Sequence, residues 1–183
     1  MILQQATLTD YETVLVFYED VIERTPHIDI YARWSKGKHP TAAGIHAFTE
    51  EGSLYLHRID GAIVGAVAVT MSQSEDYHAI KWAQDVADDE VAVIHMLAVS
   101  PDCQGQGIGA EMVKAAIQLA RERGKKSIRL DALASNTPGH RLYERLGFEY
   151  RGKQHLYAEN TGWTDFFFYE FDLEVGLRSF SCT

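Results

Sequence analysis

The chain of 183 residues has the length of one domain, and its 46% hydrophobic and 23% charged residues are typical of a globular protein. Its 17 basic and 26 acidic residues give a net charge of −9, which disfavours binding to nucleic acid or to an anionic membrane. No apolar run reaches the ~18–20 residues of a membrane span, no secretory signal is recognisable, and Cys103 and Cys182 form no CxxC pair. We therefore expect a cytoplasmic protein without a metal, with residues 1–173 as one domain and 174–183 as a tail.

The apolar spacing predicts alternating strands and helices. In the first half of the chain we expect a strand at residues 2–7, a helix from about Thr9 to Arg24, a less regular segment at 28–48 that is a loop or a short helix, a hairpin of strands at 54–60 and 62–70, and a polar excursion at 71–90. In the second half we expect a strand at 91–99, a helix at 107–123, a strand at 127–131, a short helix capped at Thr137-Pro138 and ended by Gly147, and strands at 148–151 and 165–173. Thr9 and Glu12 have capping-box spacing, and Asp60-Gly61 is typical of a hairpin turn. The hairpins indicate a mixed sheet.

The segment from Gln104 to Gly109 places three glycines at alternate positions between a strand and a helix. Glycines let the backbone turn tightly and approach a ligand without a Cβ clash. The free N–H groups at the start of the following helix form a site for an anion. The loop therefore predicts a local phosphate site in a protein whose overall charge repels phosphate.

The same glycines also fit a dinucleotide fingerprint. Gly105, Gly107 and Ala110 satisfy G-x-G-x-x-[GA], and Asp131 lies about 20 residues later at the end of the next strand, where an acid that binds a ribose is expected. Two features oppose this interpretation: Pro101 and a step of six positions separate Val99 from Gly105, and the loop lies past the middle of the chain. A nicotinamide-dependent enzyme therefore stays an alternative.

The segment LAVSPDCQGQGIG resembles the acetyl-CoA signature of the GNAT acetyltransferase superfamily, with Gln104, Gly107 and Gly109 at its fixed positions. The resemblance covers roughly residues 2–173 and is weak in the first 50. It implies an α/β GNAT fold with a central mixed, mostly antiparallel, twisted sheet of six to seven strands and about four flanking helices. It also implies acetyl-CoA as co-substrate, bound by Leu97, Ala98, Val99, Gln104, Gly105, Gln106, Gly107, Ile108, Gly109, Ala110, Asn136 and Tyr143.

The segment NTPGHRLYERLGF resembles a second motif of the same superfamily, with Asn136, Tyr143 and Gly147-Phe148 at matching spacing. Gly139 stands where an alanine is usual. The resemblance implies that Tyr143 is the acid that protonates the leaving thiolate, because a phenol with a pKa near ~10 keeps its proton at neutral pH. Asn136 is expected at the pantetheine arm. The alternatives are a tyrosine packed on the helix face and an asparagine that only caps the helix.

His95 is the candidate base, since the resemblance implies a polar group that faces the amine from this strand. An imidazole with a pKa near ~6.5 can accept a proton directly or through water. Alternation along the strand puts His95 on the face of Val93, Leu97 and Val99, or near it if a bulge intervenes. The alternative is a buried histidine that is hydrogen-bonded to the backbone.

Aromatic residues in the two irregular segments, with acids nearby, indicate a site for a cationic acceptor. The candidates are Trp34, Tyr77 and Trp82, and Asp131 is the candidate that orients the ammonium group. His39 lies in the same region as Trp34. The alternative is that the aromatic residues anchor loops on the core and that a turn satisfies Asp131.

These features predict an N-acetyltransferase that moves the acetyl group of acetyl-CoA to a primary amine of a small molecule or peptide by direct attack in a ternary complex. A non-catalytic module that binds acyl-CoA on the same fold and an NAD-dependent oxidoreductase are the alternatives. Arg141 and Arg145 could approach the phosphates, although we favour an exposed helical salt bridge. The resemblance leaves a homodimer open, and we expect neither a nucleic-acid nor a membrane partner.

Overall fold

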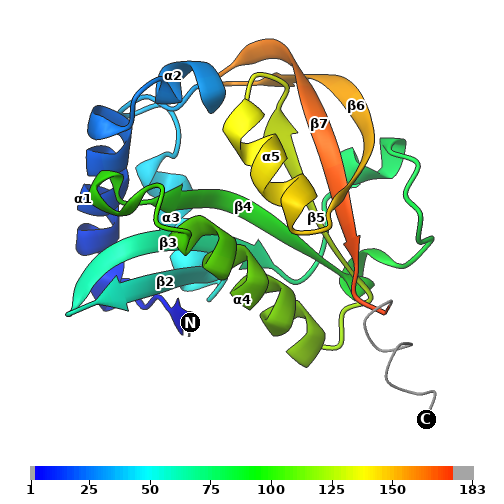
Figure 1. Cartoon of the computed structure of the whole chain (residues 1–183), viewed down its shortest axis with the longest axis horizontal. Helices are drawn as coiled ribbons and strands as arrows, with labels where there is room; N and C mark the ends of the chain where they lie inside the picture. The colour runs from blue at the N-terminus through cyan, green and yellow to red at the C-terminus, as the bar shows by residue number, and fades with distance from the viewer. Residues whose placement is uncertain (1–2, 175–183) are drawn as a thin grey trace.

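The computed structural model describes residues 3–174, which contain one seven-stranded sheet in the order β1-β2-β3-β4-β5-β7-β6 (Figure 1). The strands are β1 (Gln4–Gln5), β2 (Leu54–Ile59), β3 (Ala62–Thr70), β4 (Val91–Val99), β5 (Ser127–Leu133), β6 (Glu149–Ala158) and β7 (Gly162–Asp172). β4 and β5 are parallel, and every other neighbouring pair is antiparallel. The predicted mixed, mostly antiparallel sheet is confirmed.

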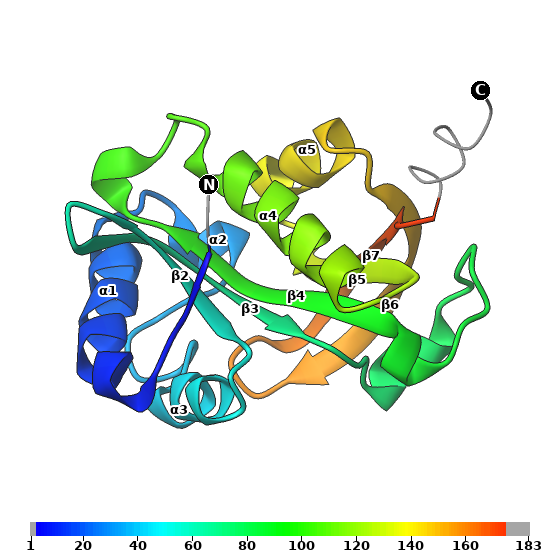
Figure 2. The ribbon, with the colours of Figure 1, turned by 90° about the horizontal axis from the view of Figure 1, so that it is seen from below.

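Helices cover both faces of the sheet. They are α1 (Tyr11–Arg24), α2 (Ile28–Tyr31), α3 (Ala42–Glu50), α4 (Ile108–Glu122) and α5 (Thr137–Arg145). α4 and α5 pack on one face and α1 and α3 on the other, each over its own group of buried apolar side chains (Figure 2). The helical spacing predicted for α4 is confirmed, because its Met112 and Ala116 are fully buried and its Ile108 and Leu119 pack against the same core.

The predicted β2–β3 hairpin is confirmed, together with its turn. Asp60 and Gly61 have φ angles of +50° and +83°, which is the backbone conformation that a two-residue hairpin turn requires and that Asp-Gly favours. β4 has the predicted bounds. Local sequence signals were sufficient at these places.

The start of the chain differs from the prediction. A 3-10 turn precedes α1, and the capping interactions predicted for Thr9 and Glu12 are made by Thr7 and Asp10. Thr7 donates its backbone N–H over 2.9 Å and its hydroxyl over 2.8 Å to the Asp10 carboxylate. Of the strand predicted at residues 2–7, Ile2 lies outside the described residues, and the described part is a strand only at Gln4–Gln5.

The segment at residues 28–48, which was predicted to be a loop or a short helix, contains two short helices, α2 and the greater part of α3. α2 has four residues, and α3 has nine, so neither offers the apolar repeat that identifies a longer helix. The hydroxyl of Thr41 caps α3 by accepting the N–H of Gly44 over 3.0 Å. The buried Ile45 and the half-buried Phe48 join the core on the α1 side of the sheet.

The last two strands are longer than the predicted 148–151 and 165–173, and they form a ten- and eleven-residue hairpin. A register shift at Gly152 interrupts the alternation of side chains. Tyr157 and Trp163 are 62% and 66% exposed, so the hairpin end lacks a buried apolar face. Because of these two features the strands lack a regular alternation of apolar and polar residues, and their full length could not be predicted from that pattern.

β4 carries a bulge at Met96, whose φ is +50°. The register against β3 slips by one residue after His95, and a bulge of this kind reverses the alternation of side chains. Leu97 and Val99 consequently pack toward α4 and α5, while His95 stays on the opposite face with Val93. The prediction that His95 shares a face with Leu97 and Val99 was therefore wrong.

The parallel pairing of β4 with β5 extends only from Val91–Ser127 to Ile94–Leu130. Beyond that point β4 is paired with β3 alone, so one backbone edge of its C-terminal half has no neighbouring strand among residues 3–174. An unpaired edge can hydrogen-bond an extended ligand. The separation of these two strands provides the place for the site described below.

The tail predicted at 174–183 lies outside the described residues except for Glu174, and so does Cys182. None of the helices within residues 3–174 is both long enough and apolar enough to cross a bilayer. The same part of the chain contains no group of three or more His, Cys, Asp or Glu residues that could hold a metal ion.

Candidate active site

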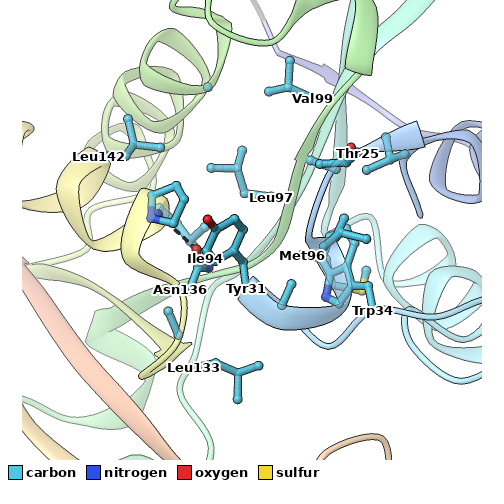
Figure 3. Close-up of a pocket in the computed structure, with 18 of the residues that line it drawn as sticks. Thr25, Tyr31, Trp34, Ile94, Met96, Leu97, Val99, Leu133, Asn136 and Leu142 are labelled. Atoms are coloured by element: carbon cyan, nitrogen blue, oxygen red, sulfur yellow. Dashed lines mark hydrogen bonds between the residues drawn. The ribbon is translucent and has the colours of Figure 1, made fainter. Parts of the chain in front are cut away.

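A cavity of about 870 Å³ occupies the space where β4 and β5 separate (Figure 3). Ligand sites of drug-sized molecules have volumes of roughly 300–1,000 Å³, so the cavity is large enough for a substrate. Figure 3 shows Leu97 and Val99 projecting from β4 toward Leu142 of α5, with Met96 on the other side of the strand near Trp34. The loop before α4 lines one end of the cavity, and α2, α3 and the β6–β7 turn line the other.

The loop at the first end has the conformation that its glycines predict. Gly105 and Gly107 have φ angles of +76° and +85°, and a Cβ added to either would meet nothing within 4 Å. These positions therefore need glycine for the backbone angle and not for lack of space. The first hydrogen bond of α4 runs from Glu111 N–H to Gly107 C=O, so the amides of residues 108–110 precede the helical ladder. They offer an anion site that opens to the cavity.

Gln104 fastens this loop to two other elements. Its side-chain amide donates to the hydroxyl of Thr25 over 2.9 Å and to the carbonyl of Val99 over 3.1 Å. The first contact reaches the end of α1 and the second reaches the end of β4. Gln106 was expected beside the ligand, but it does not line the cavity, and its side chain donates to the carbonyl of Asp102 over 3.1 Å.

Leu97, Ala98 and Val99, which the resemblance predicts to bind the co-substrate, all line the cavity, and residues of α5 line it as well. Asn136 also lines it, but the side-chain oxygen of Asn136 caps α5 by accepting the N–H of Gly139 over 3.0 Å. The cap predicted at Thr137 therefore lies one residue earlier. An alanine at Gly139 would place its Cβ 2.8 Å from that oxygen, so the glycine leaves room for the cap.

Tyr143 lies in the cavity wall between α5 and the core. Its side chain is 8% exposed and packs near the rings of Phe148 and Tyr169. Its hydroxyl has no hydrogen-bond partner among residues 3–174. Burial raises the pKa of Tyr143 well above its usual value, and the charge of Asp131 raises it further. The phenol is therefore protonated at neutral pH and available to a ligand.

Asp131 is the one acid among the described residues that line the cavity. Its Oδ1 accepts the hydroxyl of Tyr77 over 2.5 Å. Tyr77 is buried outside the cavity, where its ring stacks on Trp82 at 5.8 Å and meets Phe168 edge-on at 5.3 Å. Neither Tyr77 nor Trp82 lines the cavity, and Trp82 lies under the Arg129 guanidinium, 4.0 Å from it. Tyr77 reaches the site only through Asp131.

Two histidines line the second end of the cavity. The His95 ring stacks on Phe48 at 5.8 Å, and its Nε2 is 3.4 Å from the hydroxyl of Thr70. Burial lowers the pKa of His95, against an opposing effect of the Asp131 charge, and the same two causes act on the pKa of His39. Both imidazoles are consequently neutral at pH 7 and able to accept a proton.

Several residues at this end carry no sequence signal that could have assigned them to the site. They are Tyr31 of α2, Phe48 of α3, Met96 of the bulge, Asn160 and Thr161 of the β6–β7 turn, and Phe166 of β7. Two hydrogen bonds to backbone carbonyls hold these segments together: Ser135 donates to Ile30 over 2.7 Å, and Arg33 donates to Thr161 over 2.7 Å. Trp34 was predicted here, and it does line the cavity.

Arg145 lines the cavity from the last turn of α5, and Arg141 does not. Neither guanidinium forms an ion pair within residues 3–174, so the favoured helical salt bridge is absent there. Arg145 follows Leu142 by one helical turn, and the Leu142 side chain lies 3.7 Å from the Cβ position of Gly109. This arrangement puts Arg145 at the end of the cavity that contains the glycine loop.

Comparisons with known proteins agree with this geometry. Residues 15–148 match the acetyltransferase (GNAT) family, and this match covers well over half of the chain. The uncharacterized N-acetyltransferase MJ1207 of Methanocaldococcus jannaschii is 32% identical over 100 residues, which are 55% of this chain and 40% of that protein. The chain thus spans less than half the length of that relative.

Two solved structures share the fold at low sequence identity. The GNAT family acetyltransferase of Streptococcus agalactiae superposes with a TM-score of 0.77 at 20% identity, over 93% of this chain and 94% of that one. The yncA protein of Salmonella typhimurium, solved with its cofactor acetyl-CoA, superposes with a TM-score of 0.67 at 18% identity, over 94% of each chain. The family match, the mixed sheet and the glycine loop before α4 together show that the chain belongs to the GNAT acetyltransferase family.

Proposed function

We propose that this protein is an N-acetyltransferase that moves the acetyl group of acetyl-CoA to a primary amine within a ternary complex. The observation that carries the proposal is one continuous cavity with an amide-lined loop at one end and a carboxylate at the other. The first end suits the diphosphate of acetyl-CoA, and the second suits an ammonium group. The structural relative solved with acetyl-CoA supports the choice of co-substrate.

The residues at the first end fit the co-substrate. The amide N–H groups of residues 108–110 make no hydrogen bond within the helix and would donate to phosphate oxygens. A Cβ at Gly105 or Gly107 would meet nothing within 4 Å, so the loop is open to the ligand. The unpaired edge of β4 beyond Ile94 would pair with the amide groups of the pantetheine arm. Acetyl-CoA supplies the thioester, and the amine nitrogen attacks the carbonyl carbon of that thioester.

Tyr143 and His95 divide the proton transfers of this reaction. The ammonium group first loses one proton and becomes a neutral amine. The nitrogen–carbon bond then forms, the carbon–sulfur bond breaks, the nitrogen loses a second proton and the sulfur gains one. We assign the proton donor for sulfur to Tyr143, because burial keeps its hydroxyl protonated and no residue between 3 and 174 hydrogen-bonds it. We assign the acceptor of the amine proton to His95, directly or through water, because burial keeps its imidazole neutral.

The oxidoreductase alternative fits the structure less well. A dinucleotide-binding fold needs several parallel strands and a glycine turn directly after its strand, whereas this sheet has one parallel pair and a 3-10 turn at Pro101–Cys103 before the glycines. A non-catalytic module that binds acyl-CoA would use the same cavity. It differs from the enzyme only in lacking turnover.

The test compares the wild-type protein with Tyr143→Phe. Calorimetry measures the Kd of acetyl-CoA, and release of free CoA thiol measures turnover with a panel of primary amines. We expect the variant to bind acetyl-CoA as the wild type does and to lose about 10²-fold or more in kcat, which is the usual contribution of a general acid. Binding of acetyl-CoA without thiol release in the wild type would identify the non-catalytic module, and binding of NAD(H) in its place would identify the oxidoreductase.

A further inference from the structure

The charges at the acceptor end of the cavity restrict what an acceptor can carry, given the proposed function. Asp131 and Arg145 are the charged residues among the described residues that line the cavity. Arg145 belongs to the end with the glycine loop, one turn after Leu142. His39 and His95 are both half-buried, and the partial burial lowers the pKa of each imidazole and keeps it neutral. The acceptor end therefore contains one negative charge and no lining cation within residues 3–174.

The carboxylate of Asp131 is held in place, and one of its oxygens is available. Tyr77 donates its hydroxyl to Oδ1 over 2.5 Å, from a ring that is fixed by stacking on Trp82. Oδ2 has no hydrogen-bond partner among the described residues, and it is not among the fully buried polar atoms that lack one. A positioned carboxylate oxygen in an otherwise uncharged space is a binding partner for an ammonium group.

The remaining wall at this end is aromatic. Tyr31, Trp34, Phe48 and Phe166 come from three separate segments of the chain, and all four line the cavity. Trp34 is itself fixed, since its ring lies edge-on to Tyr18 at 5.9 Å and to His39 at 6.1 Å. Aromatic walls bind flat apolar groups, and the face of a ring also attracts a cation.

A carboxylate next to the amine has no partner here. In an amino acid the carboxylate lies one carbon from the ammonium group, so it would be placed beside Asp131 and would be repelled by it. Arg33 lies beside Trp34 in sequence, but its guanidinium donates to the carbonyl of Thr161 over 2.7 Å and does not line the cavity. We infer that the acceptor is a primary amine with an aromatic or apolar body and no carboxylate, whose ammonium group binds Asp131.

Matched acceptors test this inference. Thiol release from acetyl-CoA is measured with tyramine and tyrosine, and with phenethylamine and phenylalanine, the members of each pair differing only in the carboxylate. We expect kcat/KM to be about 100-fold higher for the amine than for the amino acid, since placing like charges together costs several kcal/mol. Tyrosinamide has the size of tyrosine without its charge, and we expect it to be used. Spermidine, with a polar body, should be used poorly.

The variant Asp131→Asn tests the residue. We expect its KM for tyramine to rise at least about 10-fold and its preference for tyramine over tyrosine to shrink toward one, with the Kd of acetyl-CoA unchanged. Equal use of tyrosine and tyramine by the wild type, or rejection of tyrosinamide together with tyrosine, would overturn the inference. Acetylation of spermidine or of amino acids without acetylation of the aromatic amines would overturn the inferred class and leave the N-acetyltransferase standing. Acetyl-CoA binding without acetylation of any amine would overturn both.

Discussion

The hydroxyl of Tyr77 donates a hydrogen bond to Oδ1 of Asp131 over 2.5 Å. Tyr77 lies outside the cavity, whereas Asp131 is the one acid among the described residues that line it. Tyr77 sits on a 3-10 turn in a polar excursion between β3 and β4, and Asp131 sits on β5. The excursion had been expected to contact substrate through Tyr77 and Trp82. The structure instead gives Tyr77 the position of a residue that orients Asp131.

The variant Tyr77→Phe keeps the packed ring and removes this hydrogen bond. We expect the KM for the amine to rise several-fold while the Kd of acetyl-CoA stays the same, because Asp131 loses its orientation and the glycine loop is not touched. The free energy of unfolding should fall by about 1–3 kcal/mol, as for other hydrogen bonds to charged groups. Steady-state kinetics and urea denaturation measure the two effects, and an unchanged KM would show that the contact is only structural.

The pH dependence of the reaction tests His95. Burial lowers the pKa of His95 below its usual value of 6.5, so the base is neutral above that lowered pKa and protonated below it. We expect kcat/KM to rise with pH through this pKa and to level off before pH 7. The variant His95→Gln should lose this limb of the profile and retain its affinity for acetyl-CoA. If kcat/KM of the variant still rises with pH as it does in the wild type, the base is another group, and His39 is the next candidate.

Two glycines in the loop provide a matched pair of variants. Gly107 has a φ of +85°, at which an alanine is strained by about 1–2 kcal/mol, whereas a Cβ on Gly109 would make ordinary contacts at 3.6 and 3.7 Å. We expect Gly107→Ala to weaken acetyl-CoA binding about 10-fold, because relief of the strain displaces the amides. Gly109→Ala should bind nearly as the wild type does. Calorimetry decides between them, and equal affinities would show that the loop conformation is unimportant.

A buried ion pair near the excursion contributes to stability and not to binding. Arg129 and Glu170 are each 1% exposed and are joined at 2.8 Å, with Arg151 also 3.0 Å from the carboxylate. We expect Arg129→Met to lower the free energy of unfolding by about 3–5 kcal/mol, because it leaves a buried carboxylate short of one partner. The double variant with Glu170→Met should recover part of this loss. Denaturation curves measure both, and a neutral effect of the single variant would contradict this account.

The sequence predicted those parts of the site that depend on local signals. The glycine positions in the loop before α4 set positive φ angles, and the Asn136–Tyr143 segment places both residues on the cavity wall. The β2–β3 turn and the buried stripe of α4 likewise follow from short-range patterns. Each of these features is fixed by residues within a few positions of one another.

The acceptor end could not be predicted in the same way. Tyr31, Phe48, Thr161 and Phe166 lie up to 135 positions apart, from 31 to 166, and only the packed fold brings them together. The bulge at Met96 reverses side-chain alternation without a sequence signal such as glycine. It moves Leu97 and Val99 to the face opposite His95, which periodicity alone could not reveal.

Main-chain amides before and within the first turn of α4 are proposed to hold the diphosphate of acetyl-CoA. A crystal structure of the complex with acetyl-CoA tests this proposal most directly. We expect phosphate oxygens within about 2.7–3.2 Å of amide nitrogens in the segment 105–110, with the thioester near the Tyr143 hydroxyl. A nucleotide bound elsewhere, or held by side chains with these amides left unoccupied, would contradict it.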